Sequence, residues 1–460
     1  MELNPRLPVI LVILLNYLLY LPTPALSDGY LLQETDLEYK GAFRVPKGNL
    51  GGTSTRADTL GSGGKALCYN QKNNSLFMIG NSKEKVIVEI SIPTPVKSST
   101  LADLPTASLI QAPIDITSGN WNKLKIDKTD ITNGGVPGGM LLYKDKLVGS
   151  AYAYYDGAYE GALSHFTASP NWSTEGAQFH GMFRVGRPVA STVNGGFVGG
   201  YMANIPTEWQ SILGGPVMTG AAGLAVISRS SLGPSAWVFD PDNLGVADPV
   251  PATMLLGYPI DHPTLGTHGG VSLYYNEATA VNGLVFPNGT DSLLFFGTHG
   301  LGYTGAGDGC YGFGTSIYEE HGRTSSSAPN TCDGTVITGE NHCCYDPVKK
   351  DKGTHAYPYV YRIWAYNAND LANVKKGLTN PATGQPYQPW DVKPYAIWNL
   401  SLPFADGSGG LPGATYDPQT QRIYISQFGG EKYGYENYPL IHVYQLRLTP
   451  TPKINSMSIK

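Results

Sequence analysis

Charged residues are scarce in this sequence. Only 15% of its 460 residues are Asp, Glu, Lys or Arg, and the formal net charge is −5. A protein that follows a phosphate backbone needs a basic face, and no cluster of Lys and Arg of that kind is present. We therefore expect no nucleic-acid partner.

Long hydrophobic runs are missing beyond the N-terminus. The apolar stretch Val9–Leu21 is shorter than the about 20 residues that a membrane-spanning helix needs. It follows Arg6 and precedes two prolines and the small residues of Ala25–Ser27, which is the pattern of a secretory signal. We expect residues 1–27 to be a signal peptide, with an uncleaved anchor as the alternative. The mature chain is then secreted or periplasmic and has no membrane span.

Cysteine is limited to five residues. Cys68 stands alone in an apolar segment, which is typical of a small buried side chain. The other four crowd into one Gly-rich stretch, and we expect them to form two disulfides that close a long insertion over residues 300–357. These four are Cys310, Cys332, Cys343 and Cys344. A zinc site is the alternative, although its usual C-x-x-C spacing is absent.

Several catalytic signatures are absent as well. The sequence has no Gly-x-Ser-x-Gly elbow, no phosphate-binding Gly-x-x-x-x-Gly-Lys-Ser/Thr loop, no His-Glu-x-x-His and no Cys-x-x-Cys-His. These absences argue against a hydrolase of the nucleophile-elbow class, a nucleotide-driven enzyme, a zincin and a c-type cytochrome.

The sequence contains many short apolar runs that are separated by glycine and proline. Its 57 Gly and 34 Pro follow no fixed period, which excludes collagen. The first and last units read most clearly as an inner strand, a tight hairpin, a second strand and a third strand. These strands are expected at Gly64–Asn70, Ser75–Gly80 and Val86–Ile92, and at Gly413–Pro418, Arg422–Ser426 and Ile441–Leu446.

Three looser copies lie between these two units. Their inner strands are expected at Gly139–Tyr143, Pro188–Val193 and Gly270–Tyr275, and outer strands at positions such as Ala396–Leu400. Repeated four-stranded units with almost no helical periodicity predict an all-β fold, a β-propeller over residues 28–449. We favour five blades. Six or seven blades, or a pair of β-sandwiches, are the alternatives.

The last unit lacks an outer strand after Leu448. Gly41–Val45 can supply that strand and close the ring, which would protect the sheet edges. The pattern of residues 413–418, 422–426 and 441–444 resembles the blade signature of NHL and YVTN-type extracellular propellers, and the chain resembles secreted propeller-like proteins without a known activity. The resemblance implies an architecture and transfers no catalytic residue. Residues 450–460 form a C-terminal tail.

Long loops gather at one end of the predicted wheel. The turns from inner to second strand are short, whereas the loops that precede the inner strands, such as Pro46–Gly63 and Gly257–Gly269, are long and Gly-rich. Rigid strands that carry long loops at one end position a binding site there. We expect a monomer that binds an extracellular ligand, a glycan or a cell-envelope component, at this loop-rich end.

The tripeptide Gly-Thr-His occurs three times and ends at His268, His299 and His355. Assigned to one unit, these residues lie at the same end of adjacent strands, about 4.8 Å apart. Together with Asp261 they match common ligands of a divalent metal, and a metal-dependent oxidoreductase would use them in that way. A polysaccharide lyase or hydrolase would use one of them for acid/base catalysis. A structural role at the base of the insertion is the third alternative.

Other residues at the same end can hydrogen-bond to sugar rings or stack on them. These further candidates are His262, Arg56, Tyr154, Tyr155, Arg187 and Glu431.

Overall fold

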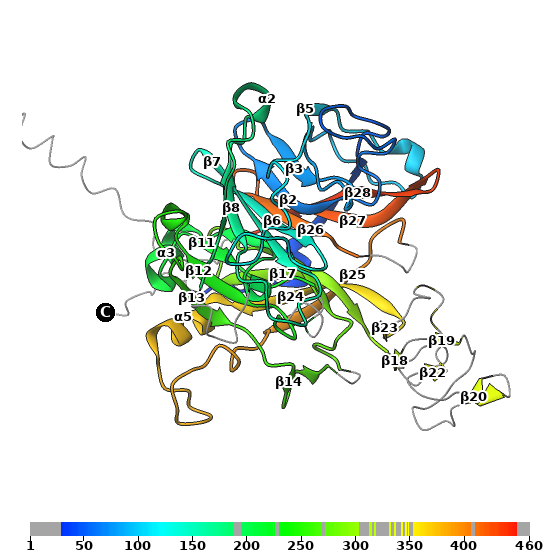
Figure 1. The fold of residues 1–460 in the computed structure, drawn as a ribbon. Coiled ribbons are helices and arrows are strands. Elements are labelled where there is room, and N and C mark those ends of the chain that lie inside the picture. The colour runs from blue at the N-terminus through cyan, green and yellow to red at the C-terminus, as the bar shows by residue number, and fades with distance from the viewer. Residues whose placement is uncertain are drawn as a thin grey trace, which may run out of the picture.

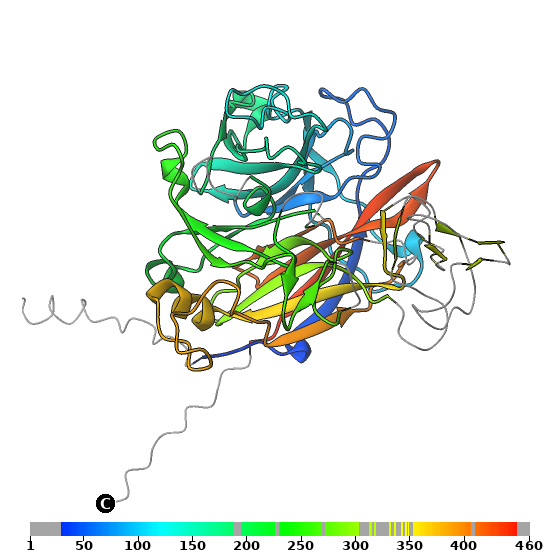
Figure 2. The same cartoon turned by 60° about the horizontal axis from the view of Figure 1, so that its bottom comes forward.

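Five antiparallel four-stranded sheets surround a common axis in the computed structural model (Figures 1 and 2). The structure describes residues 29–448 except 187–194, 224, 226–229, 269–271 and 406–409. Within 303–352 it describes only the backbone of short strands and the residues Asp346 and Val348. The predicted signal peptide and C-terminal tail lie outside these residues. The all-β class, the five blades and the four strands of each blade are confirmed.

Each blade is numbered here by the position of its inner strand along the chain. Blade 1 consists of β2 (Lys65–Asn70), β3 (Ser75–Ile79), β4 (Ile87–Ser91) and β5 (Leu109–Ile114). Blade 2 consists of β6 (Gly135–Tyr143), β7 (Lys146–Ala153), β8 (His165–Ala168) and β9 (His180–Phe183). Blade 3 consists of β10 (Met202–Asn204), β11 (Val217–Thr219), β12 (Ala236–Phe239) and β13 (Ala252–Leu256). Blade 4 consists of β16 (Ala280–Val285), β17 (Ser292–Gly300), β24 (Tyr359–Asn367) and β25 (Ala396–Leu400). Blade 5 consists of β26 (Gly413–Asp417), β27 (Arg422–Tyr433), β28 (Glu436–Leu446) and β1 (Leu37–Arg44).

The N-terminal strand closes the ring, as the sequence predicted. β1 pairs antiparallel with β28, for example Ala42 with His442, and is the outer strand of blade 5. Its register shifts by one residue between Tyr39 and Gly41. Gly41 has a φ of +120°, and a Cβ there would lie 2.4 Å from the carbonyl carbon of Val96, so only glycine fits this bulge.

The hydrophobic core is divided into five main clusters, one at each junction between neighbouring blades. Successive residues of a strand face opposite neighbours. Phe295 packs between blades 3 and 4, whereas Phe296 packs between blades 4 and 5. Both faces of the strand are therefore buried, which explains why Leu293–Phe296 is a continuous apolar run rather than an alternating one.

Two predicted inner strands were wrong. In blade 3 the inner strand is β10, not Pro188–Val193, all of which lies outside the described residues. In blade 4 it is β16, not Gly270–Tyr275. Tyr275 at the end of that second segment is instead buried by loop packing, since it stacks on Tyr258 and contacts Trp364, whereas Leu273 is exposed.

The two ends of the wheel are both elaborated. The turn end, where the inner strands finish, carries α3 (Thr207–Leu213) and α5 (Ala368–Lys376), which pack against each other, so it is less plain than the sequence predicted. Short elements complete the chain. They are η1 (Glu34–Asp36), η2 (Leu101–Asp103), α2 (Trp172–Glu175), η3 (Gly195–Phe197), η4 (Pro241–Asn243), β14 (Asp261–His262), β15 (Gly266–Thr267), β18 (Gly312–Gly314), β19 (Ile317–Tyr318), β20 (Thr331–Cys332), β21 (Thr335–Val336), β22 (His342–Cys343) and β23 (Gly353–His355).

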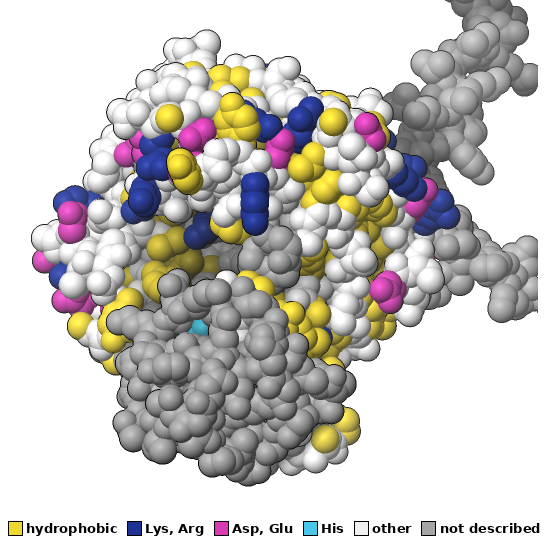
Figure 3. Space-filling model, turned by 90° about the vertical axis from the view of Figure 1, so that its right-hand side faces the viewer, with side chains coloured by type: hydrophobic (Ala, Val, Ile, Leu, Met, Phe, Trp, Pro, Cys, Tyr) yellow, Lys and Arg dark blue, Asp and Glu magenta, His cyan; other side chains and the backbone are white. Residues whose placement is uncertain are grey.

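The surface carries no large field of one charge in the view of Figure 3, where Lys, Arg, Asp and Glu side chains are scattered among uncharged ones. None of the helices in the described part of the chain is both long and apolar enough to cross a membrane. Cys68 is buried and free, as expected. The side chains of the four cysteines of the insertion lie outside the description, so their disulfides stay a prediction.

Candidate functional site

Topology places the candidate residues that the sequence predicted at the end where the inner strands begin, which is the loop-rich end. His299 lies near the end of β17, His355 precedes β24, and His268 follows β15 in the loop before β16. Arg187 lies outside the described residues. The structure gives each described histidine its own partners.

His299 is fully buried and belongs to a local hydrogen-bond network. Its Nε2 lies 2.8 Å from the carbonyl oxygen of Ser272 and therefore carries the proton, so its Nδ1 accepts the hydroxyl hydrogen of Thr279 at 2.9 Å. Burial, aided by the positive charge of Arg362, lowers the pKa of His299 to about 3. This histidine is a neutral structural group at physiological pH.

The other two Gly-Thr-His histidines each face one carboxylate. The Nδ1 of His355 lies 2.8 Å from the Oδ2 of Asp346, and both side chains are buried. The Nδ1 of His268 lies 3.1 Å from the Oδ1 of Asp261 in an exposed position. The described residues contain no group of three or more His, Cys, Asp or Glu that could hold a metal ion. The metal and acid/base roles of these histidines stay predictions.

The remaining candidates on this end are mostly engaged in ion pairs or exposed. Arg56 pairs with Glu436 at 2.9 Å, and the buried Glu431 pairs with Lys47 at 2.5 Å. Tyr154 and Tyr155 follow β7 and are exposed.

Glu277 is a residue of this end that sequence reasoning missed. It lies three residues before β16, its side chain is 3% exposed, and its Oε1 has no hydrogen-bond partner among the described residues. Its negative charge adds to the burial that raises the pKa of Tyr154, which comes from blade 2. A single Glu between Asn276 and Ala278 has no sequence signal that would have revealed this.

A groove with a volume of about 960 Å³ lies outside the central axis, between blades 3 and 4. One wall is the loop after β13, which contains Tyr258 and His262. The other is the segment after α5, which contains Tyr387 and Trp390. β14 and α5, which flank the two walls, lie on the same lower side of Figure 1. A groove of this size suits an organic ligand of several rings.

His262 joins the two walls of this groove. Its Nδ1 accepts hydrogen bonds from the backbone N–H groups of Thr264 and Leu265, at 3.2 and 3.1 Å, so its Nε2 carries the proton and donates to the carbonyl oxygen of Trp390 at 3.0 Å. The hydroxyl of Tyr258 donates to the carbonyl oxygen of Val392 at 2.5 Å. Burial, aided by Lys393, lowers the pKa of His262. This predicted candidate therefore holds Trp390 in place.

The groove combines an exposed aromatic side chain with a carboxylate that can accept hydrogen bonds. Trp390 is 44% exposed. Asp370 on α5 lines the groove, has no hydrogen bond or ion pair to any other described side chain, and has a pKa raised by burial. Asp391 and Lys393 add one charge of each sign. An aromatic ring beside a carboxylate can hold a sugar, because the ring covers the apolar face and the carboxylate accepts hydroxyl hydrogens.

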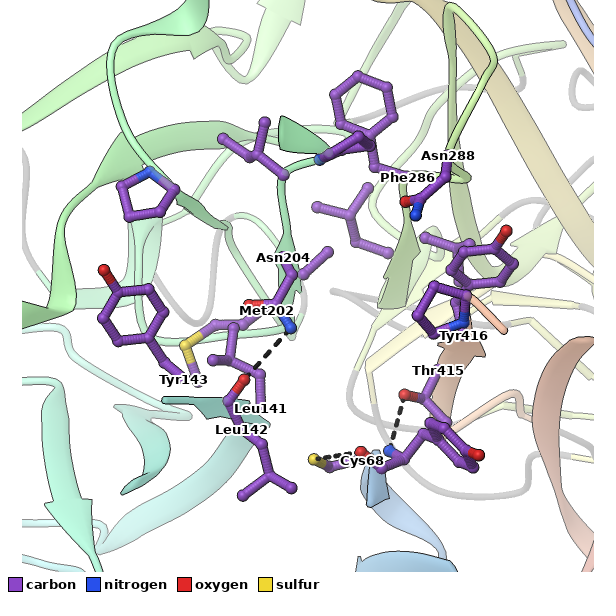
Figure 4. Close-up of a pocket in the computed structure, with 18 of the residues that line it drawn as sticks. Cys68, Leu141, Leu142, Tyr143, Met202, Asn204, Phe286, Asn288, Thr415 and Tyr416 are labelled. Atoms are coloured by element: carbon purple, nitrogen blue, oxygen red, sulfur yellow. Dashed lines mark hydrogen bonds between the residues drawn. The ribbon is translucent and has the colours of Figure 1, made fainter. Parts of the chain in front are cut away.

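A second cavity, of about 350 Å³, opens at the turn end of the central axis, and all five inner strands contribute to it (Figure 4). Its wall is almost uncharged. Asn204 donates to the carbonyl oxygen of Leu142 at 3.3 Å, and the backbone N–H of Tyr69 donates to the Oγ1 of Thr415 at 3.0 Å. Burial raises the pKa of the Cys68 thiol at the base of this cavity to about 12, so it is not a nucleophile. The cavity suits a small uncharged molecule.

The axis is narrow between this cavity and the loop-rich end. A Cβ on Gly138 would lie 1.8 Å from the carbonyl oxygen of Gly199, so the backbones of blades 2 and 3 touch there. The cavity beside Thr279 at the loop-rich end has a volume of about 10 Å³, which is room for about one water molecule.

Sequence reasoning missed the groove because it assigned no role to the segment between β24 and β25. The signal that could have revealed it is a Pro-rich polar stretch with two aromatic residues, Tyr387 and Trp390. Aromatic side chains in such a loop have no strand to pack on. They are therefore candidates for a ligand contact.

Comparison with known proteins adds only distant structural likenesses. No protein-family model and no curated protein matches the chain. Among solved structures, the chain is similar to a luciferin-regenerating enzyme at 8% identity, over 84% of this chain and 92% of that one, with a TM-score of 0.33. An oxidoreductase from Thermus thermophilus, described as a glucose dehydrogenase, matches at 11% identity. The match covers 84% of this chain and 97% of that one, with a TM-score of 0.28. The endosialidase of phage phi92 matches at 11% identity, over 94% of this chain and 50% of that one, with a TM-score of 0.31.

Proposed function

We propose that this chain is an exported β-propeller that binds a carbohydrate of the extracellular space or the cell envelope, and that the groove between blades 3 and 4 is its binding site. The observation that carries the proposal is the half-exposed Trp390 beside Asp370, a carboxylate without a described partner. The predicted signal over residues 1–27 supports export. One groove wall leaves β13 at the loop-rich end, where binding was expected.

Sugar chemistry fits the groove better than a strongly charged or a purely apolar ligand. A pyranose ring has an apolar face that stacks on an aromatic side chain, and its hydroxyl groups donate to carboxylates. The walls hold Asp370 and Asp391 against Lys393, so the groove has no cationic excess that would select a polyanion. A neutral oligosaccharide is therefore the expected ligand.

A glycan array probed with the mature protein tests this proposal. We expect binding to a set of neutral glycans that Trp390→Ala removes or weakens. About half of the exposed Trp390 surface, on the order of 50 Å², would be covered by a sugar ring, which corresponds to about 1.4 kcal/mol, or about tenfold in affinity.

Tyr155→Ala is the matched control, because it removes an exposed aromatic ring at the loop-rich end outside the groove. It should retain the same glycans with unchanged affinity. Binding that Tyr155→Ala removes and Trp390→Ala leaves intact would place the carbohydrate at the loop-rich mouth. Wild-type protein that binds no glycan on the array would refute the proposed function.

A further inference from the structure

Glu277 is a buried carboxylate whose neighbours in the sequence make hydrogen bonds to other groups. The Nδ2 of Asn276 donates to the carbonyl oxygen of Gly300 at 2.8 Å, and its Oδ1 accepts the backbone N–H of Ala278 at 3.0 Å. The Oγ1 of Thr279 accepts the backbone N–H of Asn276 at 3.0 Å and donates to His299. None of these hydrogen bonds involves the side chain of Glu277.

No described cation compensates for its charge. His299 is neutral because burial lowers its pKa to about 3. Arg362, the cation of the same blade, donates to the carbonyl oxygen of Leu273 at 2.7 Å and to the Oδ1 of Asn399 at 3.0 Å. A buried carboxylate oxygen without a hydrogen-bond partner costs folding free energy, so the Oε1 of Glu277 calls for a functional reason.

The position of Glu277 gives that reason. It stands at the loop-rich end of the axis, directly before the inner strand of blade 4, and interacts electrostatically with Tyr154 of blade 2. The small cavity next to Thr279, two residues from Glu277, has room for about one water molecule only. A larger ligand would therefore reach Glu277 from the loop-rich side, where the ring of Tyr154 is exposed.

We propose that Glu277 anchors a second binding site, for an organic cation with a primary ammonium or guanidinium group, whose carbon chain lies against Tyr154. The cation neutralises the carboxylate, and an aromatic ring beside it adds a favourable cation–π contact. An inorganic divalent ion fits less well, because Glu277 belongs to no group of three or more His, Cys, Asp or Glu that could hold a metal ion among the described residues. This site is independent of the carbohydrate groove.

Isothermal titration of the mature protein with putrescine tests the proposal, with n-butanol as an uncharged probe of similar length. We expect wild-type protein to bind putrescine and not n-butanol. Glu277→Gln, which keeps the shape of the side chain, should weaken putrescine binding by about tenfold or more. Glu436→Gln is the matched control: it removes the same charge from the same end at a carboxylate that is already paired with Arg56, and it should retain binding.

Three results would overturn this site. The first is the absence of putrescine binding to wild-type protein at millimolar concentration. The second is equal binding by wild-type and Glu277→Gln proteins that both show wild-type circular dichroism. The third is binding of calcium that depends on Glu277 in a protein that ignores putrescine, because that result would assign the carboxylate to a metal.

Discussion

Acidification should destabilise this propeller strongly, through three buried histidines. His165, His299 and His442 are each fully buried, and burial lowers the pKa of each to about 3. In each ring the Nε2 donates to an oxygen and the Nδ1 accepts a hydroxyl hydrogen, from Ser164, Thr279 and Tyr39 respectively. The folded state therefore requires the neutral imidazole.

The magnitude follows from linkage between protonation and folding. In the unfolded chain a histidine titrates near pH 6.5, so below that pH the unfolded state binds protons that the folded state does not bind. The free energy of unfolding therefore falls as the pH falls. Between pH 7 and pH 5 each histidine costs about 2 kcal/mol, and the three together cost about 6 kcal/mol. This equals much of the net stability of a typical domain.

Urea unfolding at several pH values between 5 and 8 measures the effect. We expect the free energy of unfolding to fall along a curve whose slope approaches about 4 kcal/mol per pH unit. His442→Gln and His165→Gln should each remove about a third of that slope, which separates the histidines from carboxylates titrating in the same range. A slope that neither variant changes would refute the reasoning.

Three further predictions concern the groove and the ring. Asp370→Asn should make carbohydrate affinity independent of pH, whereas wild-type affinity, measured by titration calorimetry, should fall on acidification with a midpoint above 3.8, because burial raises the pKa of this carboxyl. His262→Gln should weaken carbohydrate binding several-fold with little change in melting temperature, while His268→Gln, an exposed control outside the groove, should leave affinity unchanged. Gly41→Ala should lower the free energy of unfolding by about 3 kcal/mol because its Cβ meets the Val96 backbone, whereas Gly48→Ala, also at positive φ but in open space, should cost about 1 kcal/mol or less.

The architecture could be predicted from the sequence where hairpins are tight and strands are apolar on both faces. The turn at Gln71–Asn74 and the run Leu293–Phe296 are local signals, and the missing outer strand after Leu448 predicted the closure by β1. The prediction of the inner strand of blade 3 failed because that strand is only three residues long and because α3 lies in the connection to the second strand. The prediction of the inner strand of blade 4 failed because Tyr274 and Tyr275, residues typical of strands, lie in a loop.

The site depends on contacts that no local pattern contains. Three copies of Gly-Thr-His predicted a cluster, which stays a prediction, and the contacts of these histidines with Thr279, Asp261 and Asp346 could not be read from the tripeptide. The groove forms because the backbone of Trp390 meets His262, 128 residues earlier. Glu277 is recognised as a candidate only from the folded structure, where its Oε1 is buried without a hydrogen-bond partner among the described residues.

Hydrogen–deuterium exchange, with and without an oligosaccharide selected on the glycan array, tests the location of the binding site most directly. The binding site proposed here predicts that the ligand slows amide exchange in residues 257–264 and 380–393, the two walls of the groove, and leaves residues 143–145 and 204–210 at the turn end unchanged. Protection confined to the turn end, or to the loop-rich loops around Tyr154 and Glu277, would contradict it.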